Sequence, residues 1–316
     1  MTPKDVAGVF SRYFIVGFYL PSFFALVALT QGLSSQALPD LYEDYGDGTR
    51  IALVGGAALL LGLVVMGLNY QILRWFEGYP LQNRRNRWYA RRFHDYLLAR
   101  QLESYESLIS IRDSMDAPDA ERGEAAWRLD YRFSEDPNRN LLPTRFGNAI
   151  RAFERHARLR WGLNSISAWP RIEMLQSEQQ REVEVNARGE VAFFINGCLL
   201  AVVAGALLAI DEAVTGVTPL SFVWVYVFPF AVGYAFYRWA IGAAVRWGNT
   251  VRASIDMHRF ELYRLVGLRE PETFTEERDE LAPALNRSLL YGDPLPDKFR
   301  AKASRAAEEV KEDEDE

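Results

Sequence analysis

Four stretches of the chain are almost free of charged side chains and long enough to form apolar helices. They are residues 13–33, 51–73, 191–210 and 222–237. A helix needs about 20 mostly apolar residues to cross a bilayer, and the last stretch reaches that length if Arg238 extends its side chain to the interface. The second and third stretches are apolar on all sides, unlike the one-faced helices of a soluble core. The pattern predicts four transmembrane helices in two hairpins.

The first apolar stretch has an alternative, a cleaved secretory signal, because Ser35 and Ala37 follow it at the spacing of a cleavage site. Its apolar run is longer than the about 7 to 15 residues of a signal core, and Pro21 interrupts it. We therefore expect this stretch to remain as a membrane helix.

Outside the apolar stretches, the spacing of apolar residues predicts helices and no strands. Thr144 is expected as a helix N-cap, Gly162 and Asn164 as a turn, and Trp169-Pro170 as a further break in the chain. The expected helices cover residues 81–115, 121–133, 145–161, 174–194, 251–268 and 277–292, with a loop at 134–143.

These elements predict an all-α membrane protein with an all-helical cytoplasmic domain. The final residues EEVKEDEDE carry too much charge and too few apolar side chains to fold alone. The expected divisions are a first transmembrane hairpin (1–75), a cytoplasmic helical domain (76–189), a second transmembrane hairpin (190–244), cytoplasmic juxtamembrane helices (245–306) and a disordered acidic tail (307–316).

The distribution of charge predicts the orientation of the chain. The net charge is -6, and acids dominate the loop at 38–50 and the link that begins with Asp211 and Glu212. Arginines instead follow the second and fourth apolar stretches, and Lys and Arg mark cytoplasmic flanks. We expect a multi-pass protein of a bacterial plasma (inner) membrane, with both termini in the cytoplasm.

The arginines after the second stretch are also candidates for contact with anionic lipid headgroups, each worth about 1 kcal/mol near the surface. Nucleic-acid binding is the alternative, because Trp88 and Phe93 lie among these arginines. Residues 74–189 hold 20 arginines against 17 acids, so the segment is only mildly basic, and we expect no nucleic-acid partner. The candidate lipid contacts are Arg84, Arg85, Arg87, Arg91 and Arg92.

Signatures of chemistry are scarce. The three histidines are far apart in sequence, and the single cysteine, Cys198, lies inside the third apolar stretch. We find no nucleophile, phosphate-loop or dinucleotide motif, so we expect no metal, no cofactor and no catalytic residue. The third stretch carries Ala201, Gly205 and Ala209, a small-residue stripe that suits close helix packing, either within the chain or between two copies.

Residues 143–172 carry the most distinctive pattern, and we interpret it in two ways. Arg151, Arg155 and Arg171 with Asn148 form either a pocket for a phosphate or carboxylate, or a structural corner in which Trp161 and Trp169 pack the turn. The elements are Pro143, Thr144, Gly147 and Asn148; Arg151 and Glu154; Trp161, Gly162 and Leu163; and Trp169, Pro170 and Arg171. In that order they resemble a motif of uncharacterised bacterial multi-span membrane proteins, except that Trp161 stands where that motif has Tyr. The resemblance covers about a tenth of the chain and implies no activity.

The sequence favours a protein that acts without chemistry, as a scaffold, a sensor or an oligomeric membrane effector, through its cytoplasmic helices. Its expected partners are anionic membrane lipids, a second copy of the chain and a cytoplasmic protein. One alternative is an oligomeric channel lined by the aromatic residues of the fourth stretch. A second is a lipid-modifying enzyme that uses His156 and Arg171 near the headgroups.

Overall fold

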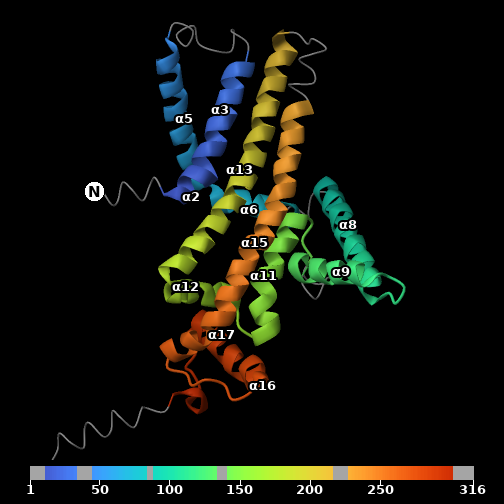
Figure 1. Ribbon diagram of the computed structural model, residues 1–316, viewed down its shortest axis with the longest axis vertical. Helices are drawn as coiled ribbons and strands as arrows, with labels where there is room; N and C mark the ends of the chain where they lie inside the picture. Colours follow the sequence, from blue (N-terminus) through green and yellow to red (C-terminus); the bar gives the residue numbers. More distant parts are fainter. Residues whose placement is uncertain (1–10, 34–44, 84–87, 134–140, 216–226, 302–316) are drawn as a thin grey trace, which may run out of the picture. The chain divides into compact units, whose positions relative to one another are not determined.

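The computed structural model describes residues 11–33, 45–83, 88–133, 141–215 and 227–301 (Figure 1). These residues are helical apart from turns and one isolated bridge between Leu268 and Arg300, which confirms the all-helical prediction for this part of the chain. The chain divides into two compact units. The larger unit comprises residues 1–152 and 182–248, and the smaller unit comprises residues 153–181 and 249–316.

Three helices of the structure are long and apolar enough to cross a membrane. They are Arg12–Gly32, α5 (Asp47–Gly67), and α13 (Glu178–Thr215), which contains an apolar stretch of sufficient length. Figure 1 shows α3 and α5 as neighbours in the larger unit. The fourth predicted span overlaps α15 (Phe228–Leu265), but residues 216–226 lie outside the described part, so this span stays a prediction.

The first candidate membrane helix consists of α2 (Arg12–Phe14), the π-helical turn η1 (Ile15–Tyr19) and α3 (Leu20–Gly32), and Pro21 lies at the start of α3. Proline has no N–H to donate to the carbonyl of Gly17, four residues earlier. The side-chain Nδ2 of Asn196, on α13, donates to that oxygen at 2.8 Å. A fully buried amide thus satisfies the carbonyl that the proline leaves free.

The second apolar stretch is not one helix to residue 73. α5 ends at Gly67, Leu68 leaves helical geometry, and α6 (Asn69–Glu77) follows as a separate short helix. α6 is amphipathic, with Ile72 buried and Trp75 exposed, so its residues suit an interface better than a hydrocarbon core. It ends at Gly78, whose φ of 92° is readily available only to glycine.

The remaining helices of the larger unit agree closely with the predicted ranges. α7 (Tyr79–Asn83) and α8 (Trp88–Asp113) cover the expected 81–115 helix apart from residues 84–87, which are not described, and α9 (Asp119–Arg132) covers 121–133. Leu129, Phe133 and Leu141 form a buried cluster against apolar side chains of α8, including Leu98, Leu102 and Tyr105.

The smaller unit is built from the later part of α11 (Arg145–Trp161) and the end of α15, with several short helices. The segment at 251–268, predicted as a separate juxtamembrane helix, is continuous with α15 as far as Leu265. The short helices are α12 (Ser165–Leu175), α16 (Phe274–Glu276), η3 (Glu277–Leu281), α17 (Ala282–Tyr291) and η4 (Asp297–Phe299).

The predicted break at Trp169-Pro170 is wrong. Pro170 lies inside α12, and the chain breaks instead at Gln176 and Ser177. Proline removes a single helical hydrogen bond here, while Asn164 caps the helix by accepting from the N–H groups of Ile166 and Ser167. The local cost is therefore offset by the cap and by burial of one face of α12.

Candidate functional site

The predicted corner begins in the larger unit, where the segment after α9 meets the start of α11. Thr144 caps α11 as predicted, accepting from the N–H of Gly147 at 3.0 Å. Its hydroxyl also donates to the carbonyl of Phe76, on α6, at 2.7 Å. Gly147 is required by close approach, because a Cβ there would lie 2.5 Å from the carbonyl oxygen of Glu77. Two of the motif positions therefore hold α6 against α11.

Asn148 uses its side chain to fix the segment that precedes α11. Its Oδ1 accepts from the N–H of Leu142 at 2.7 Å, and its Nδ2 donates to the carbonyl of the same residue at 2.9 Å. A longer contact of 3.4 Å joins Nδ2 to Oε1 of Gln101, on α8. Asn148 is 2% exposed and Leu142 is 1% exposed, so these bonds replace water at a buried backbone position.

The arginines proposed for the anion pocket have partners within the chain. Arg151 donates from Nη2 to the phenol of Tyr79 at 2.6 Å, in the larger unit. Arg171, in the smaller unit, donates from Nη1 to the carbonyl of Ser167 at 2.9 Å, and Arg155 is also engaged. Since Asn148 and Arg151 belong to one unit and Arg155 and Arg171 to the other, a common anion pocket stays a prediction.

In the smaller unit, the turn after α11 is fixed by residues from α15 and α17. The indole Nε1 of Trp161 donates to Oδ1 of Asp256 at 2.6 Å. Asn286 donates from Nδ2 to the carbonyl of Gly162 at 2.8 Å. Gly162 has a φ of 73°, and a Cβ there would overlap the carbonyl oxygen of Arg278. The tryptophan and glycine of the motif are therefore set by packing and backbone geometry in this turn.

A buried ion pair adjoins Trp161. The Nε of Arg259 donates to Oε1 of Glu277 at 3.0 Å, and the phenol of Tyr263 donates to the same oxygen at 3.0 Å. The guanidinium of Arg259 lies 3.9 Å from the ring centroid of Trp161. Burial and the neighbouring Glu277 carboxylate raise the pKa of Tyr263 above its ordinary value, so this phenol stays protonated and keeps donating.

His156 faces Asp256, and their closest approach joins Nε2 to a carboxylate oxygen at 3.4 Å. Burial, and then the positive charge of Arg252, lower the pKa of His156 despite the attraction of Asp256. The imidazole is therefore neutral at neutral pH. A His–Asp pair is a component of acid–base sites, but Trp161 shares this carboxylate, which suits a structural pair equally well.

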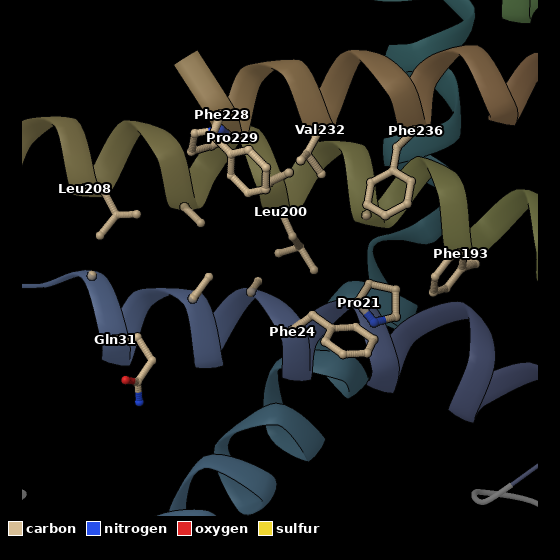
Figure 2. Close-up of a pocket in the computed structure, with 16 residues that line it drawn as sticks. Pro21, Phe24, Gln31, Phe193, Leu200, Leu208, Phe228, Pro229, Val232 and Phe236 are labelled. Atoms are coloured by element: carbon tan, nitrogen blue, oxygen red, sulfur yellow. The ribbon is translucent and has the colours of Figure 1, made fainter. Parts of the chain in front are cut away.

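An apolar cavity of about 620 Å³ lies among α3, α13 and α15 of the larger unit. Figure 2 shows side chains of all three helices around it, including Phe24, Leu200 and Pro229. Gln31 is the one lining residue with a polar side chain among the residues that the structure describes. Such a volume falls within the roughly 300–1,000 Å³ range of ligand pockets, and its lining suits a hydrocarbon chain.

The small-residue stripe of α13 lies beside this cavity. A Cβ on Gly205 would lie 2.6 Å from a carbon of Pro229, so α15 approaches α13 closely at this point. Ala201 lines the cavity, and Ala209 lies two turns further along α13. This contact lies within the chain, which is one of the two uses we expected of the stripe.

Of the candidate lipid contacts, Arg91 and Arg92 are exposed on the first turn of α8, and Arg91 lies 3.7 Å from Asp95. Arg84, Arg85 and Arg87 lie outside the described residues. Headgroup binding by this cluster stays a prediction.

Several residues of the site were not found from the sequence. Asp256, Arg259 and Glu277 carry no local pattern, since their partners lie far away along the chain. One local signal was missed: Ser177 and Gln180 form a reciprocal cap at the start of α13, with bonds of 3.0 and 3.3 Å, in the S-x-x-Q spacing of a capping box. Within the described ranges, no group of three or more metal-ligating side chains occurs.

Comparisons of the chain with protein-family models, with curated proteins and with solved structures find no match.

Proposed function

We propose that the protein is a non-enzymatic integral membrane protein that acts as a scaffold or sensor. In this proposal it holds a lipid chain in the apolar cavity of its membrane helices and offers its cytoplasmic helices to a protein partner. The observation that carries the proposal is the cavity. A polar ligand would lose its hydrogen bonds to water in such an apolar lining, whereas a hydrocarbon chain has none to lose.

The polar residues of the motif give further support. Thr144, Asn148, Trp161 and Arg171 each bond to a backbone or side-chain group of this chain. The bond of Trp161 joins α11 to α15, that of Thr144 caps α11, that of Asn148 fixes the segment before it, and that of Arg171 lies within α12. Such contacts support a structural role, as expected of a scaffold. The tests below also distinguish this proposal from a channel and from a lipid-modifying enzyme.

The test is lipid binding to the purified full chain in detergent, with phosphatidylcholine as the probe and native mass spectrometry as the measurement. Ala28 is exposed and lines the cavity, so Ala28→Phe should fill part of it and reduce the number of bound lipids. Ala57, exposed on α5, does not line it, so Ala57→Phe is the matched control.

Equal lipid binding by the two variants would refute the proposed use of the cavity. Ion flux through liposomes containing the protein would favour the channel. Conversion of a phospholipid that is lost in His156→Gln, with folding intact, would favour the enzyme.

A further inference from the structure

A second cavity of the larger unit combines basic and apolar lining, and we name it the basic cleft. It has a volume of about 930 Å³ and is lined by residues of α6, α8, α13 and α15 and by the start of α11. Arg100, Arg145 and Arg238 come from three different helices and meet at this cleft, together with the hydroxyl groups of Ser104 and Ser107. Guanidinium and hydroxyl groups together are a donor set suited to phosphate oxygens.

The apolar side of the cleft is formed by α13 and α6. Leu199 and Val202 of α13 line it, as does Trp75 of α6. Trp75 is 66% exposed and Tyr234, also in the lining, is 61% exposed. Exposed Trp and Tyr with arginines beside an apolar helix are typical of the membrane–water interface.

Arginines outnumber acids in the described lining of the cleft. Glu103 is the one acidic residue in the described lining. Arg238 donates to the phenol of Tyr234 at 3.3 Å, and Arg100 donates to the phenol of Tyr96 at 3.5 Å. Both partners are neutral, and within the described residues none of the three lining arginines forms an ion pair with a carboxylate.

Arg132, at the end of α9, is also affected by the positive charge of two of these arginines. Burial lowers its pKa, and the positive charges of Arg128, Arg145 and Arg238 lower it further, against the opposite effect of Glu124. Its Nε is buried without a hydrogen-bond partner among the described residues. The positive charges of Arg145 and Arg238 thus reach Arg132 as well, and an anion in the cleft would offset this repulsion.

We propose that the basic cleft binds an anionic phospholipid, with its phosphate between Arg100, Arg145 and Arg238 and an acyl chain along Leu199 and Val202. Basic pockets at the boundary of membrane helices recognise anionic headgroups through this combination of charge and hydrocarbon. The proposal is independent of the apolar cavity among α3, α13 and α15, which shares no lining residue with the cleft.

The experiment is a titration of the purified full chain in detergent with phosphatidylglycerol, phosphatidylcholine and inorganic phosphate. Bound lipid is counted by native mass spectrometry, and all three ligands are compared by thermal unfolding. Phosphatidylglycerol should bind most tightly, and the double variant Arg145→Gln with Arg238→Gln should weaken its binding about thirtyfold, from roughly 1 kcal/mol for each arginine. The control is Arg158→Gln with Arg287→Gln, exposed arginines of the smaller unit, which removes the same charge away from the cleft.

Glu103→Gln gives a second test, in which the variant is expected to bind phosphatidylglycerol more tightly than the parent protein. Removing the one acid of the lining should tighten phosphatidylglycerol binding about fivefold. Glu106→Gln, one turn further on α8 and outside the lining, should leave the affinity unchanged. Three results would overturn the proposal: equal binding of phosphatidylcholine, stabilisation by inorganic phosphate alone to the same extent, or no difference between the two glutamate variants.

Discussion

Replacing Asn148 with alanine tests whether the 143–148 segment is held by one buried amide. The substitution removes both partners of the Leu142 backbone, whose N–H and carbonyl now bond to Asn148 at 2.7 and 2.9 Å. A buried polar group left without a partner costs about 1 to 3 kcal/mol, so two such groups predict a loss of roughly 2 to 6 kcal/mol in the free energy of unfolding. That loss is a large fraction of the about 5 to 15 kcal/mol that stabilises a typical domain.

The assay is unfolding of the purified protein in detergent, combined with hydrogen exchange at the amide of Leu142. We expect lower stability and faster exchange at this amide in Asn148→Ala. The control is Asn249→Ala, an exposed position on α15, where the change should stay within about 0.5 kcal/mol. Unchanged exchange at Leu142 together with unchanged stability would refute the structural role of Asn148.

Asn148→Asp adds a dependence on pH. The aspartate keeps an acceptor for the N–H of Leu142 but loses the donor to its carbonyl. Protonation restores that donor, so the folded-state pKa of the new carboxyl should be raised. The variant should therefore be most stable at low pH and lose stability as the pH rises through that pKa. A flat profile relative to the parent protein would contradict the prediction.

Three further predictions concern other parts of the molecule. Gly162→Ala should destabilise the smaller unit by more than about 1 kcal/mol, because the Cβ overlaps the Arg278 carbonyl and φ is positive; reversible unfolding measures it, and a neutral result would contradict the turn geometry. Burial lowers the pKa of His156, so the neutral imidazole contributes to the free energy of unfolding above pH 6.5, and this contribution is lost as the pH falls through the folded-state pKa. His156→Gln should flatten the pH dependence of the unfolding free energy in this range. In a cysteine-free background, Asp47→Cys should react with an impermeant thiol reagent outside intact cells while Ser110→Cys should not, and the reverse result would invert the proposed topology.

Helix positions were predictable because the spacing of apolar residues and the capping residues are local properties of the chain. The helix expected at 121–133 is observed as Asp119–Arg132, and Thr144 caps the helix that it was expected to cap. The prediction at Pro170 failed because a proline lowers the stability of a helix interior but does not prevent the helix when other contacts offset that cost. In α12 the Asn164 cap and the buried face offset the cost of the proline.

The pairings between distant residues were not predictable from one sequence. Trp161 and Asp256 are 95 positions apart, and neither has a neighbour in sequence that marks it as a partner of the other. The same holds for Asn286, which bonds to the carbonyl of a glycine 124 positions away. Periodicity specifies which face of a helix is buried, but it does not specify what that face meets.

Arginines that are clustered in the sequence and arginines that meet in the folded structure are different groups in this protein. The cluster at 84–92 is conspicuous in the sequence, and a run of arginines beside an apolar stretch is also the expected signal of a cytoplasmic flank. Arg100, Arg145 and Arg238 stand apart in the sequence and meet at one cleft beside apolar residues of α13. Charges that share a partly desolvated cleft interact more strongly than charges spread over a solvated surface, since the local dielectric is lower. Substitutions at these three positions should therefore change lipid affinity more than substitutions at Arg91 and Arg92, although the sequence alone ranks them in the opposite order.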